Sequence, residues 1–183
     1  MAKLELATAA ITAYEVMDLY GTLESLGVEI WIDGGWGVDA LLGEQSRLHK
    51  DLDITIQQKD LPKLRELLRK RGYKDIQVEH ARDWNFVLGD EHGREIDVHV
   101  IVLDSQGDGI YGPPERGEKY PAASLMGSGL IDGKTVKCIS PEWMVKFHSG
   151  YELKEQDFQD VSALCRKFGM DLPSEYERFR ESS

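Results

Sequence analysis

Apolar and polar residues change their spacing several times along the chain, and each spacing predicts a different element. From Ala9 to Leu26 apolar residues recur every three to four positions, which predicts a helix that ends at Gly27. Polar and apolar side chains alternate over residues 51–56, which predicts a strand with one buried face. Trp84–Leu88 and Arg94–Leu103 predict two further strands joined by a hairpin turn.

The remaining stretches complete an α+β chain with a mostly antiparallel or mixed sheet. A buried strand at Val28–Ile32 leads into a glycine-rich turn at 33–37, and Gly107–Gly129 has no clear period, which predicts a long loop. The other predicted elements are a short helix at Val38–Leu42, a helix between Asp60 and Gly72, a strand at Thr135–Ile139, and helices at Pro141–Glu152, Asp157–Phe168 and Ser174–Phe179. We therefore expect a core over residues 1–139 and a helical C-terminal part over 140–183.

Composition narrows the functional classes. The 183 residues carry 22 Lys and Arg against 33 Asp and Glu, a formal net charge of −11. Binding to duplex nucleic acid needs basic residues that neutralise phosphates, so this balance argues against a nucleic-acid partner and is compatible with a cationic small molecule. Two cysteines outside any CxxC pair give no disulfide framework. The N-terminus is a poor signal peptide and no apolar run approaches about 20 residues, so we expect a cytoplasmic protein with no membrane partner.

Carboxylates on the predicted strands form the first candidate site. Asp51 and Asp53 project from one face of their strand and repel each other unless a cation lies between them; oxygen ligands suit Mg²⁺. A solvated strand face is the alternative interpretation of such a pair. Asp97 changes the balance, because it stands on the polar face of another strand and would join the pair if the two strands are neighbours. Three acids on one sheet face fit a two-metal phosphoryl-transfer site.

A phosphate-binding element precedes these acids. Gly34 and Gly35 follow a strand and offer backbone N–H groups to an anion. Arg47 stands four residues before Asp51, and Lys146 lies on a later predicted helix; either could clamp the outer phosphates. Glycine pairs are common in turns, so the evidence is their order: strand, Gly-Gly, fifteen residues, Asp-x-Asp, and then an isolated strand aspartate.

This order resembles the nucleotidyltransferase superfamily built on the DNA polymerase β palm. The resemblance covers roughly residues 30–169, is strongest over Trp31–Asp53, and points to small lincosamide nucleotidyltransferases and, more distantly, to aminoglycoside 2″-adenylyltransferases. It implies a polymerase-β-like core, a mixed sheet flanked by helices, with a small helical C-terminal part. The segments that carry it are Trp31–Gly43, Arg47–Asp53, Ile96–His99 and Phe147–Tyr151.

The resemblance also implies an activity and roles for single residues. The expected reaction transfers AMP from Mg²⁺·ATP to a hydroxyl group of a small antibiotic and releases pyrophosphate, and a homodimer is plausible by analogy. Asp97 would be the general base toward the acceptor hydroxyl. Two Mg²⁺ ions would be present with bound nucleotide, the metal ligands would be Asp51, Asp53 and Asp97, and the triphosphate would meet Gly34, Gly35 and Arg47.

Acceptor-binding candidates are less sharply defined by the sequence. We expect Trp36 to face the cleft from the glycine-rich turn, whereas Asp33 is expected to hydrogen-bond that turn. His99 either touches substrate and Asp97 or is a structural histidine, and His49 is similarly ambiguous. Two residues could line the acceptor pocket or pack their helix, namely His148 and Tyr151. The acidic residues Glu152, Glu155, Asp157 and Asp160 form either a solvated helix face or a source of attraction for a protonated amine.

Several acceptors and two other classes of function stay open. A lincosamide is the first expectation, an aminoglycoside the second and an unknown metabolite hydroxyl the third. A minimal nucleotidyltransferase of the toxin–antitoxin type, acting on a protein partner, would be shorter and would lack the C-terminal helices. A catalytically silent nucleotide-binding module is disfavoured by the complete set Asp51, Asp53 and Asp97.

Overall fold

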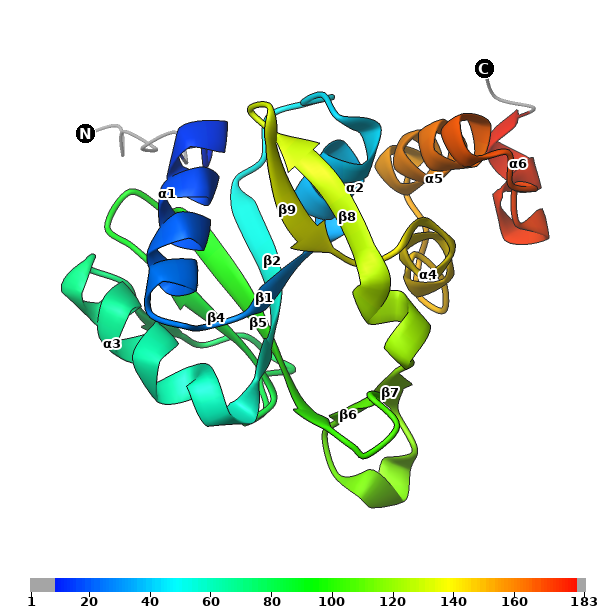
Figure 1. Cartoon of the computed structure of the whole chain (residues 1–183). Helices are drawn as coiled ribbons and strands as arrows, with labels where there is room; N and C mark the ends of the chain where they lie inside the picture. Colours follow the sequence, from blue (N-terminus) through cyan, green and yellow to red (C-terminus); the bar gives the residue numbers. More distant parts are fainter. Residues whose placement is uncertain (1–8, 181–183) are drawn as a thin grey trace.

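A mixed β-sheet forms the centre of the protein. The computed structural model describes residues 9–180, and within this range nine strands pair in the order β3-β4-β5-β2-β1-β9-β8, with β6 and β7 attached to the end of β5 (Figure 1). The pairs β2–β5 and β1–β9 are parallel, and the other pairs are antiparallel. The strands are β1 Ile30–Asp33, β2 Asp51–Gln57, β3 Lys74–Ile76, β4 Asn85–Gly89, β5 Glu95–Leu103, β6 Gly109–Tyr111, β7 Lys119–Tyr120, β8 Gly127–Ile131 and β9 Lys134–Cys138.

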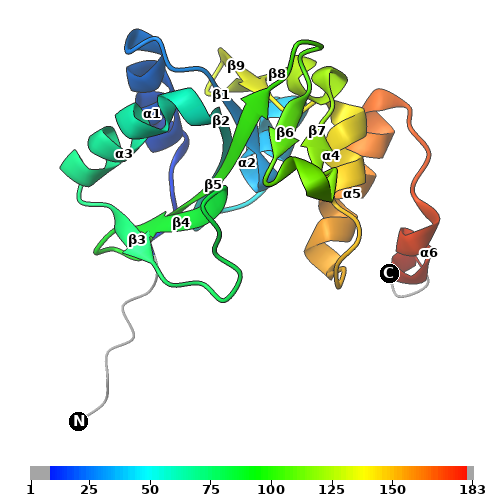
Figure 2. The same ribbon diagram turned by 90° about the horizontal axis from the view of Figure 1, so that it is seen from below.

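Helices cover both faces of this sheet, as the view from below shows (Figure 2). Helices α1 and α3 lie on one face, and α2 lies on the other, where α4 and α5 pack against it (Figure 1). The strand predicted for residues 51–56 is confirmed, and Leu52 and Ile54 are buried while Asp51 and Asp53 are half-buried on the opposite face. The alternation ends at Thr55, which shares the face of the aspartates and is also buried. The helices are α1 Ala13–Ser25, α2 Gly34–Leu42, α3 Leu61–Lys70, α4 Pro141–Phe147, α5 Glu155–Phe168 and α6 Glu177–Arg180, with short 3₁₀ turns η1 Gln58–Asp60, η2 Pro114–Arg116, η3 Ala122–Met126 and η4 Ser174–Tyr176.

The predicted loop over Gly107–Gly129 is wrong. This stretch contains β6, η2, β7, η3 and the start of β8. Strands of two or three residues, such as β6 and β7, are too short to show an alternating pattern. The segment therefore extends β5 as a small ribbon and brings Tyr111 and Tyr120 next to the carboxylate face.

Helix boundaries also differ from the predictions. The first helix begins at Ala13, because Thr12 and Glu15 form a capping box. Helix α2 begins at Gly34 and includes the residues predicted as a glycine-rich turn, so both glycines belong to its first turn. Helix α4 ends at Phe147, five residues before the predicted end, where the carbonyl oxygen of Met144 accepts a hydrogen bond from the backbone N–H of His148.

The C-terminal helices are joined to the core through α2. Both α4 and α5 pack against α2, and Tyr176, which is fully buried, donates a hydrogen bond from its hydroxyl group to the carbonyl oxygen of His148. The division at residues 139/140 therefore stays a prediction. No helix in residues 9–180 is long and apolar enough to cross a membrane. The predictions about a signal peptide concern the first residues, most of which lie outside the described range.

The packing of β8 on α2 gives a stability prediction. A Cβ atom added to Gly129 would lie 2.3 Å from the carbonyl oxygen of Ala40 and 2.4 Å from its carbonyl carbon, and backbone atoms cannot give way easily. We expect Gly129→Ala to lower the free energy of unfolding by about 1–3 kcal/mol, the usual cost of overpacking. Urea unfolding followed by circular dichroism measures the change.

Gly21→Ala is the matched control for this substitution. Gly21 lies inside α1, and a Cβ atom there meets nothing within 4 Å. Alanine is favoured over glycine in a helix interior by about 1 kcal/mol, so this variant should be slightly more stable than the wild type. Equal stability of Gly129→Ala and the wild type would show that β8 moves away from α2 at no cost.

Candidate active site

Three aspartates from three neighbouring strands form a row on one face of the sheet. In the strand register Asp33 of β1 pairs with Asp53 of β2, which in turn pairs with Asp97 of β5. Asp51 lies one pleat away from Asp53 on the same face, opposite Glu95. β2 and β5 are therefore neighbours, as the prediction of a three-acid site requires. Asp33 of β1 adds another carboxylate to the acidic row.

Electrostatics mark Asp53 and Asp97 as the centre of this row. Burial raises the pKa of Asp53 well above its usual value, and the nearby carboxylates of Asp97, Asp33 and Asp51 raise it further. Burial also raises the pKa of Asp97, although His99 and a hydrogen bond from Asn85 partly offset the rise. The folded protein thus holds several acids where their charges repel, and a bound cation would relieve this repulsion.

The donor atoms fit a metal ion. Among the described residues, ligand atoms of Asp53, Asp97 and His99 all lie within 4.8 Å of one another. Carboxylate oxygens are the ligands that Mg²⁺ and Mn²⁺ prefer, and they also bridge pairs of such ions in phosphoryl-transfer sites. Asp53, Asp97 and His99 therefore fit a divalent cation, whereas Asp51, the third predicted ligand, is not part of this cluster.

The first turn of α2 lies directly against these carboxylates. A Cβ atom at Gly34 would lie 2.1 Å from Oδ2 of Asp53, and the residue has a positive φ of 54°, so no larger residue fits here. Asp33 accepts a hydrogen bond from the backbone N–H of Gly34 at 2.8 Å, which confirms its predicted role in the turn. A helix N-terminus carries partial positive charge and unpaired N–H groups, so it can bind phosphate oxygens beside the metal ligands.

Arg47 reaches the same turn from the segment before β2. A Cβ atom at Gly35 would lie 2.6 Å from Nη2 of Arg47 and 2.6 Å from Nδ1 of His49, so these side chains lie on the backbone of α2. Arg47 also lines a cleft of about 870 Å³. Lys50 and Asp51 line the same cleft, as do Tyr151 and other residues of the α4–α5 connection. The predicted phosphate-binding residues are thus brought together at one helix turn, with Gly34 against Asp53 and Gly35 against Arg47.

A buried hydrogen-bond chain fixes His49. Its Nδ1 atom accepts a hydrogen bond from Nη1 of Arg47 at 2.8 Å, because a guanidinium has no acceptor. The proton therefore sits on Nε2, which donates to Oδ2 of Asp39 at 2.5 Å, and Oδ1 of Asp39 accepts from the hydroxyl and backbone N–H of Ser46. His49 is 1% exposed and is a structural residue, which resolves one ambiguity of the sequence.

Asp97 is held by a second set of contacts on the side of the β6–β7 ribbon. The amide of Asn85 donates to its Oδ1 at 2.9 Å, and Nε2 of His99 lies 3.7 Å from the same oxygen. Nδ1 of His99 lies 3.2 Å from the hydroxyl group of Tyr111, and burial raises the pKa of that phenol. His99 therefore lies beside Asp97, the proposed general base, which is one of the two alternatives that the sequence left open for it.

The prediction that Trp36 faces the cleft is wrong. Its side chain is 1% exposed and packs on His49, with ring centres 4.8 Å apart. The cause is the early start of α2. Position 36 falls on the buried side of a helix rather than at the tip of a turn.

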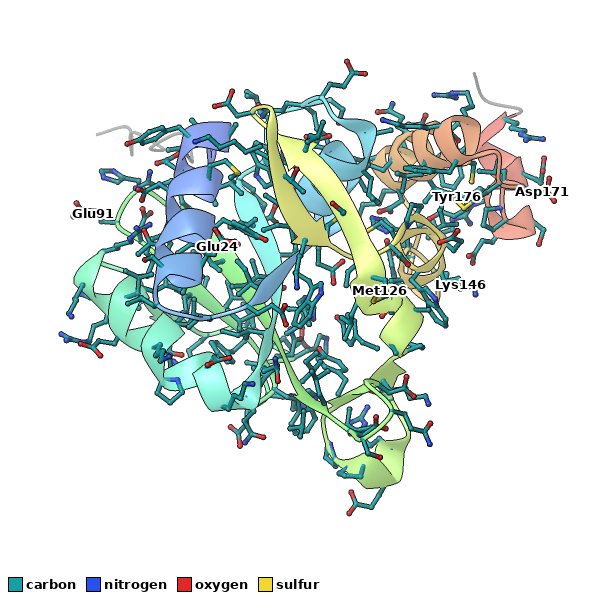
Figure 3. The ribbon with its side chains drawn as sticks, in the orientation of Figure 1. Glu24, Glu91, Met126, Lys146, Asp171 and Tyr176 are labelled. Carbon is teal, nitrogen blue, oxygen red and sulfur yellow. The ribbon has the colours of Figure 1, made fainter. Side chains whose placement is uncertain are left out.

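The other acceptor and phosphate candidates are distributed around the cleft. Tyr151 is 50% exposed, lines the cleft and donates a hydrogen bond to Asp157 at 3.0 Å. His148 ends α4, and its Nδ1 lies 2.8 Å from the carbonyl oxygen of Met144. Lys146 projects from α4 with its ammonium 4.2 Å from the centre of the Trp143 ring, and it is not among the residues that line the cleft with Arg47 (Figure 3).

Sequence reasoning missed the role of Asp160. It belongs to an acidic cluster interpreted as a solvated helix face or a source of attraction for an amine, yet its side chain is 8% exposed and pairs with Arg47 at 3.3 Å. Asp39, Asn85 and Tyr111 were also missed. A buried acid a few residues after the exposed acids Glu152 and Glu155 has no distinct sequence signal, since helical spacing alone does not say which positions a neighbouring segment covers.

A separate cavity of about 330 Å³ lies on the opposite face of the sheet, between α1 and α3. Its floor is apolar, formed by Leu19, Leu52, Leu68 and Ile96, and it contains none of the sheet aspartates of the acidic row. The carboxylate face and its cleft are therefore the site where charge, hydrogen-bond donors and open space coincide.

The fold and this site together define a class of enzyme. A mixed sheet with adjacent strand aspartates, facing the N-terminus of a helix that begins Gly-Gly, is the arrangement of nucleotidyltransferases, and solved structures of that fold match the chain. The chain belongs to the aminoglycoside-2″-adenylyltransferase family, whose family model matches residues 15–164, and it is a nucleotidyltransferase. The polymerase-β-like fold expected from the sequence is thereby confirmed.

Individual relatives divide into two groups by their acceptors. The chain is 34% identical over 154 residues to a lincosamide resistance protein of Staphylococcus haemolyticus, covering 84% of this chain and 94% of that protein. A 2″-aminoglycoside nucleotidyltransferase of Klebsiella pneumoniae is 26% identical over 132 residues, covering 71% of this chain and 68% of that protein.

Solved structures show the same division. The lincosamide antibiotic adenylyltransferase LnuA, solved with lincomycin bound, superimposes with a TM-score of 0.74 at 32% identity, over 85% of this chain and 98% of that one. The structure of ANT(2″)-Ia with adenylyl-2″-tobramycin gives a TM-score of 0.70 at 18% identity, over 93% and 95% of the two chains. The second match shows the shared fold.

The raised carboxyl pKa values predict a pH effect on stability in the absence of metal. Folding disfavours the ionised form of Asp53, so its contribution is favourable at pH values below the unfolded carboxyl pKa of about 4. That contribution is lost as the pH rises through the raised pKa of the folded state. Asp53→Asn removes the charge, and in EDTA it should be more stable than the wild type at pH 7 but not at pH 3.5.

Urea unfolding at a series of pH values measures this difference. Asp83→Asn is the control, because Asp83 is an exposed aspartate outside the acidic row. Lower stability of Asp53→Asn than of the wild type at pH 7 in EDTA would mean that the fold stabilises the carboxylate without a cation. In the absence of EDTA, added Mg²⁺ or Mn²⁺ is expected to stabilise the wild type and to leave Asp53→Asn nearly unchanged.

Proposed function

We propose that this enzyme transfers AMP from Mg²⁺·ATP to a hydroxyl group of a lincosamide and releases pyrophosphate. The observation that carries the proposal is the alignment of Asp53 and Asp97 beside the first turn of α2, with Arg47 at the same turn. The choice of acceptor is supported by the 34% identity to a lincosamide resistance protein over nearly its full length and by the likeness to lincomycin-bound LnuA.

The proposed chemistry begins at the acceptor hydroxyl. Its oxygen forms a bond to the α-phosphorus of ATP while its proton passes to a carboxylate oxygen of Asp97. The bond between the α-phosphorus and the oxygen that bridges to the β-phosphate breaks, and pyrophosphate leaves with that electron pair. A raised pKa suits Asp97 to this role, because a base with a higher pKa holds the transferred proton better.

Asp51, Asp53 and Asp97 are the residues that would hold the divalent cations. The ions supply positive charge that stabilises the attacking and leaving oxygens and offsets the repulsion within the acidic row. The N–H groups of the first turn of α2 and the guanidinium of Arg47 orient the β- and γ-phosphates. Lys146 could reach an outer phosphate only if its side chain leaves the ring of Trp143, so its role is a separate hypothesis.

The acceptor is expected on the other side of the acidic row from the triphosphate. His99, held between Asp97 and Tyr111, borders that side, whereas Tyr151 lines the same cleft as Arg47. His148 is less suited, because its ring is engaged with the end of α4. A protonated amine would be favoured near this surface, since the row and the cleft both contain carboxylates.

An aminoglycoside is the second candidate acceptor. The observation in its favour is the family model itself, which describes 2″-adenylyltransferases and matches residues 15–164. The relatives that act on aminoglycosides are less similar to this chain than the lincosamide resistance protein is, and they match over a smaller share of their length. Lincosamide therefore comes first.

Incubation with Mg²⁺·ATP and an acceptor panel tests the proposal. With lincomycin or clindamycin the enzyme should release pyrophosphate and give a product heavier by one AMP, detected by mass spectrometry. Replacement of ATP by the other nucleoside triphosphates tests the donor. Transfer to tobramycin or gentamicin but not to lincomycin would reverse the order of the two acceptors, and no metal-dependent pyrophosphate with any acceptor would refute the proposal.

Asp97→Asn tests the general base. The amide keeps the shape and the hydrogen-bonding position near Asn85 but cannot take up the proton, so kcat should fall by about 10²–10⁴-fold. Acceptor binding, measured by isothermal titration calorimetry, should change much less. A kcat within tenfold of the wild type would assign the base to another group.

A further inference from the structure

A chain of four polar side chains connects α2, the segment before β2, and α5. Asp39 of α2 accepts from His49, and His49 accepts from Arg47. Nη2 of Arg47 in turn donates to Oδ2 of Asp160 on α5 at 3.3 Å. The side-chain amide of Gln156, one helical turn before Asp160, also lies against the guanidinium, and because a guanidinium has no acceptor only the amide oxygen can bond to it. Arg47 is thus held on two sides by groups from different parts of the chain.

The burial of this chain is unusual for residues of these types. Asp39, His49 and Asp160 are 2%, 1% and 7% exposed, whereas the side chain of Arg47 is 27% exposed and lines the cleft. Burying acids is costly unless they are paired and hydrogen-bonded. Burial raises the pKa of Asp160, which Arg47 partly offsets. The three buried residues are thus connected by hydrogen bonds to Arg47, the one residue of the chain that reaches the cleft.

We propose that Asp160 is a positioning residue, which holds the guanidinium of Arg47 in the orientation that receives the triphosphate. The proposal rests on the proposed function, since it takes Arg47 to meet the phosphates. The Asp39–His49 pair fixes Nη1 with a neutral acceptor, and Asp160 fixes Nη2 with a charge. Helix α5 therefore contributes to nucleotide binding without touching the nucleotide. A preset guanidinium loses less side-chain freedom when the ligand binds.

Two explanations for the contact between Asp160 and Arg47 predict opposite changes in nucleotide affinity when Asp160 is neutralised. If Asp160 merely competed with the triphosphate for Arg47, its neutralisation would free the guanidinium and tighten nucleotide binding. If Asp160 positions Arg47, neutralisation leaves a long, flexible side chain without its charged anchor and weakens binding. The sign of the change in nucleotide affinity separates the two explanations.

The experiment compares Asp160→Asn with the wild type in two assays. Steady-state kinetics with lincomycin give kcat and the KM values for both substrates, and calorimetry gives the affinity for a non-hydrolysable ATP analogue in the presence of Mg²⁺. We expect about a tenfold rise in the KM for ATP and a similar loss of analogue affinity, the size typical of one charge-assisted hydrogen bond. The KM for lincomycin should stay within twofold. Tighter analogue binding would overturn the proposal.

Three further variants exclude a merely structural effect. Asp171→Asn removes an exposed aspartate just beyond the C-terminal end of α5 and should leave both assays within twofold of the wild type (Figure 3). In an Arg47→Ala background, Asp160→Asn should cause no further loss of analogue affinity; an undiminished loss would overturn the proposal. Asp160→Glu keeps the charge and should bind the ATP analogue more tightly than Asp160→Asn does. This variant tests the proposal even if Asp160→Asn folds poorly. A folded Asp160→Glu variant that recovers no affinity would contradict the positioning role.

Failure of this proposal and failure of the proposed function are distinguishable. A wild type that binds the ATP analogue but transfers nothing contradicts the proposed transfer reaction, while the binding assay still decides the role of Asp160. A wild type that transfers AMP, with Asp160→Asn unchanged in both KM for ATP and analogue affinity, contradicts the positioning role alone.

Discussion

The repulsion among aspartates on adjacent strands is the constraint on which the rest of the site depends. Asp33, Asp53 and Asp97 are held in register by β1, β2 and β5, which are central strands that cannot separate without breaking the sheet. Rigid backbone therefore keeps like charges together where flexible side chains on a loop would move apart. A glycine at position 34 lets the positive end of α2 approach these charges, and the remaining repulsion is what a cation relieves.

The carboxylate pattern was predictable from sequence because it depends on local alternation. Asp51 and Asp53 share a face in any extended strand, and Asp97 follows the same rule in β5. The resemblance to nucleotidyltransferases added the expectation that β2 and β5 are neighbours, which alternation cannot supply. Alternation does not reveal that Asp33 belongs to the row, because its place there depends on the pairing of β1 with β2.

Long-range packing explains what the sequence did not reveal. Trp36 follows two glycines that are typical of a turn, but an α-helix begins at the first of them and places the ring in the core. The residues after Gly107 lack any period because their strands are very short and pair with β5 and with each other. Asp160 stands among exposed acids, and its burial depends on Arg47, more than a hundred residues earlier in the chain.

The arrangement separates the chemistry from the choice of acceptor. The acids and the first turn of α2 come from central strands and the helix that follows β1, whereas Tyr111, which lies beside His99, and Tyr151, which lines the cleft, come from β6 and the α4–α5 connection. Connecting segments tolerate substitution better than central strands do. Under the proposed function, Tyr111 and Tyr151 can therefore change with the acceptor while Asp53 and Asp97 stay in register. Two families of antibiotic can then be modified on one fold, because the metal-binding strands need not change when the surface facing the antibiotic does.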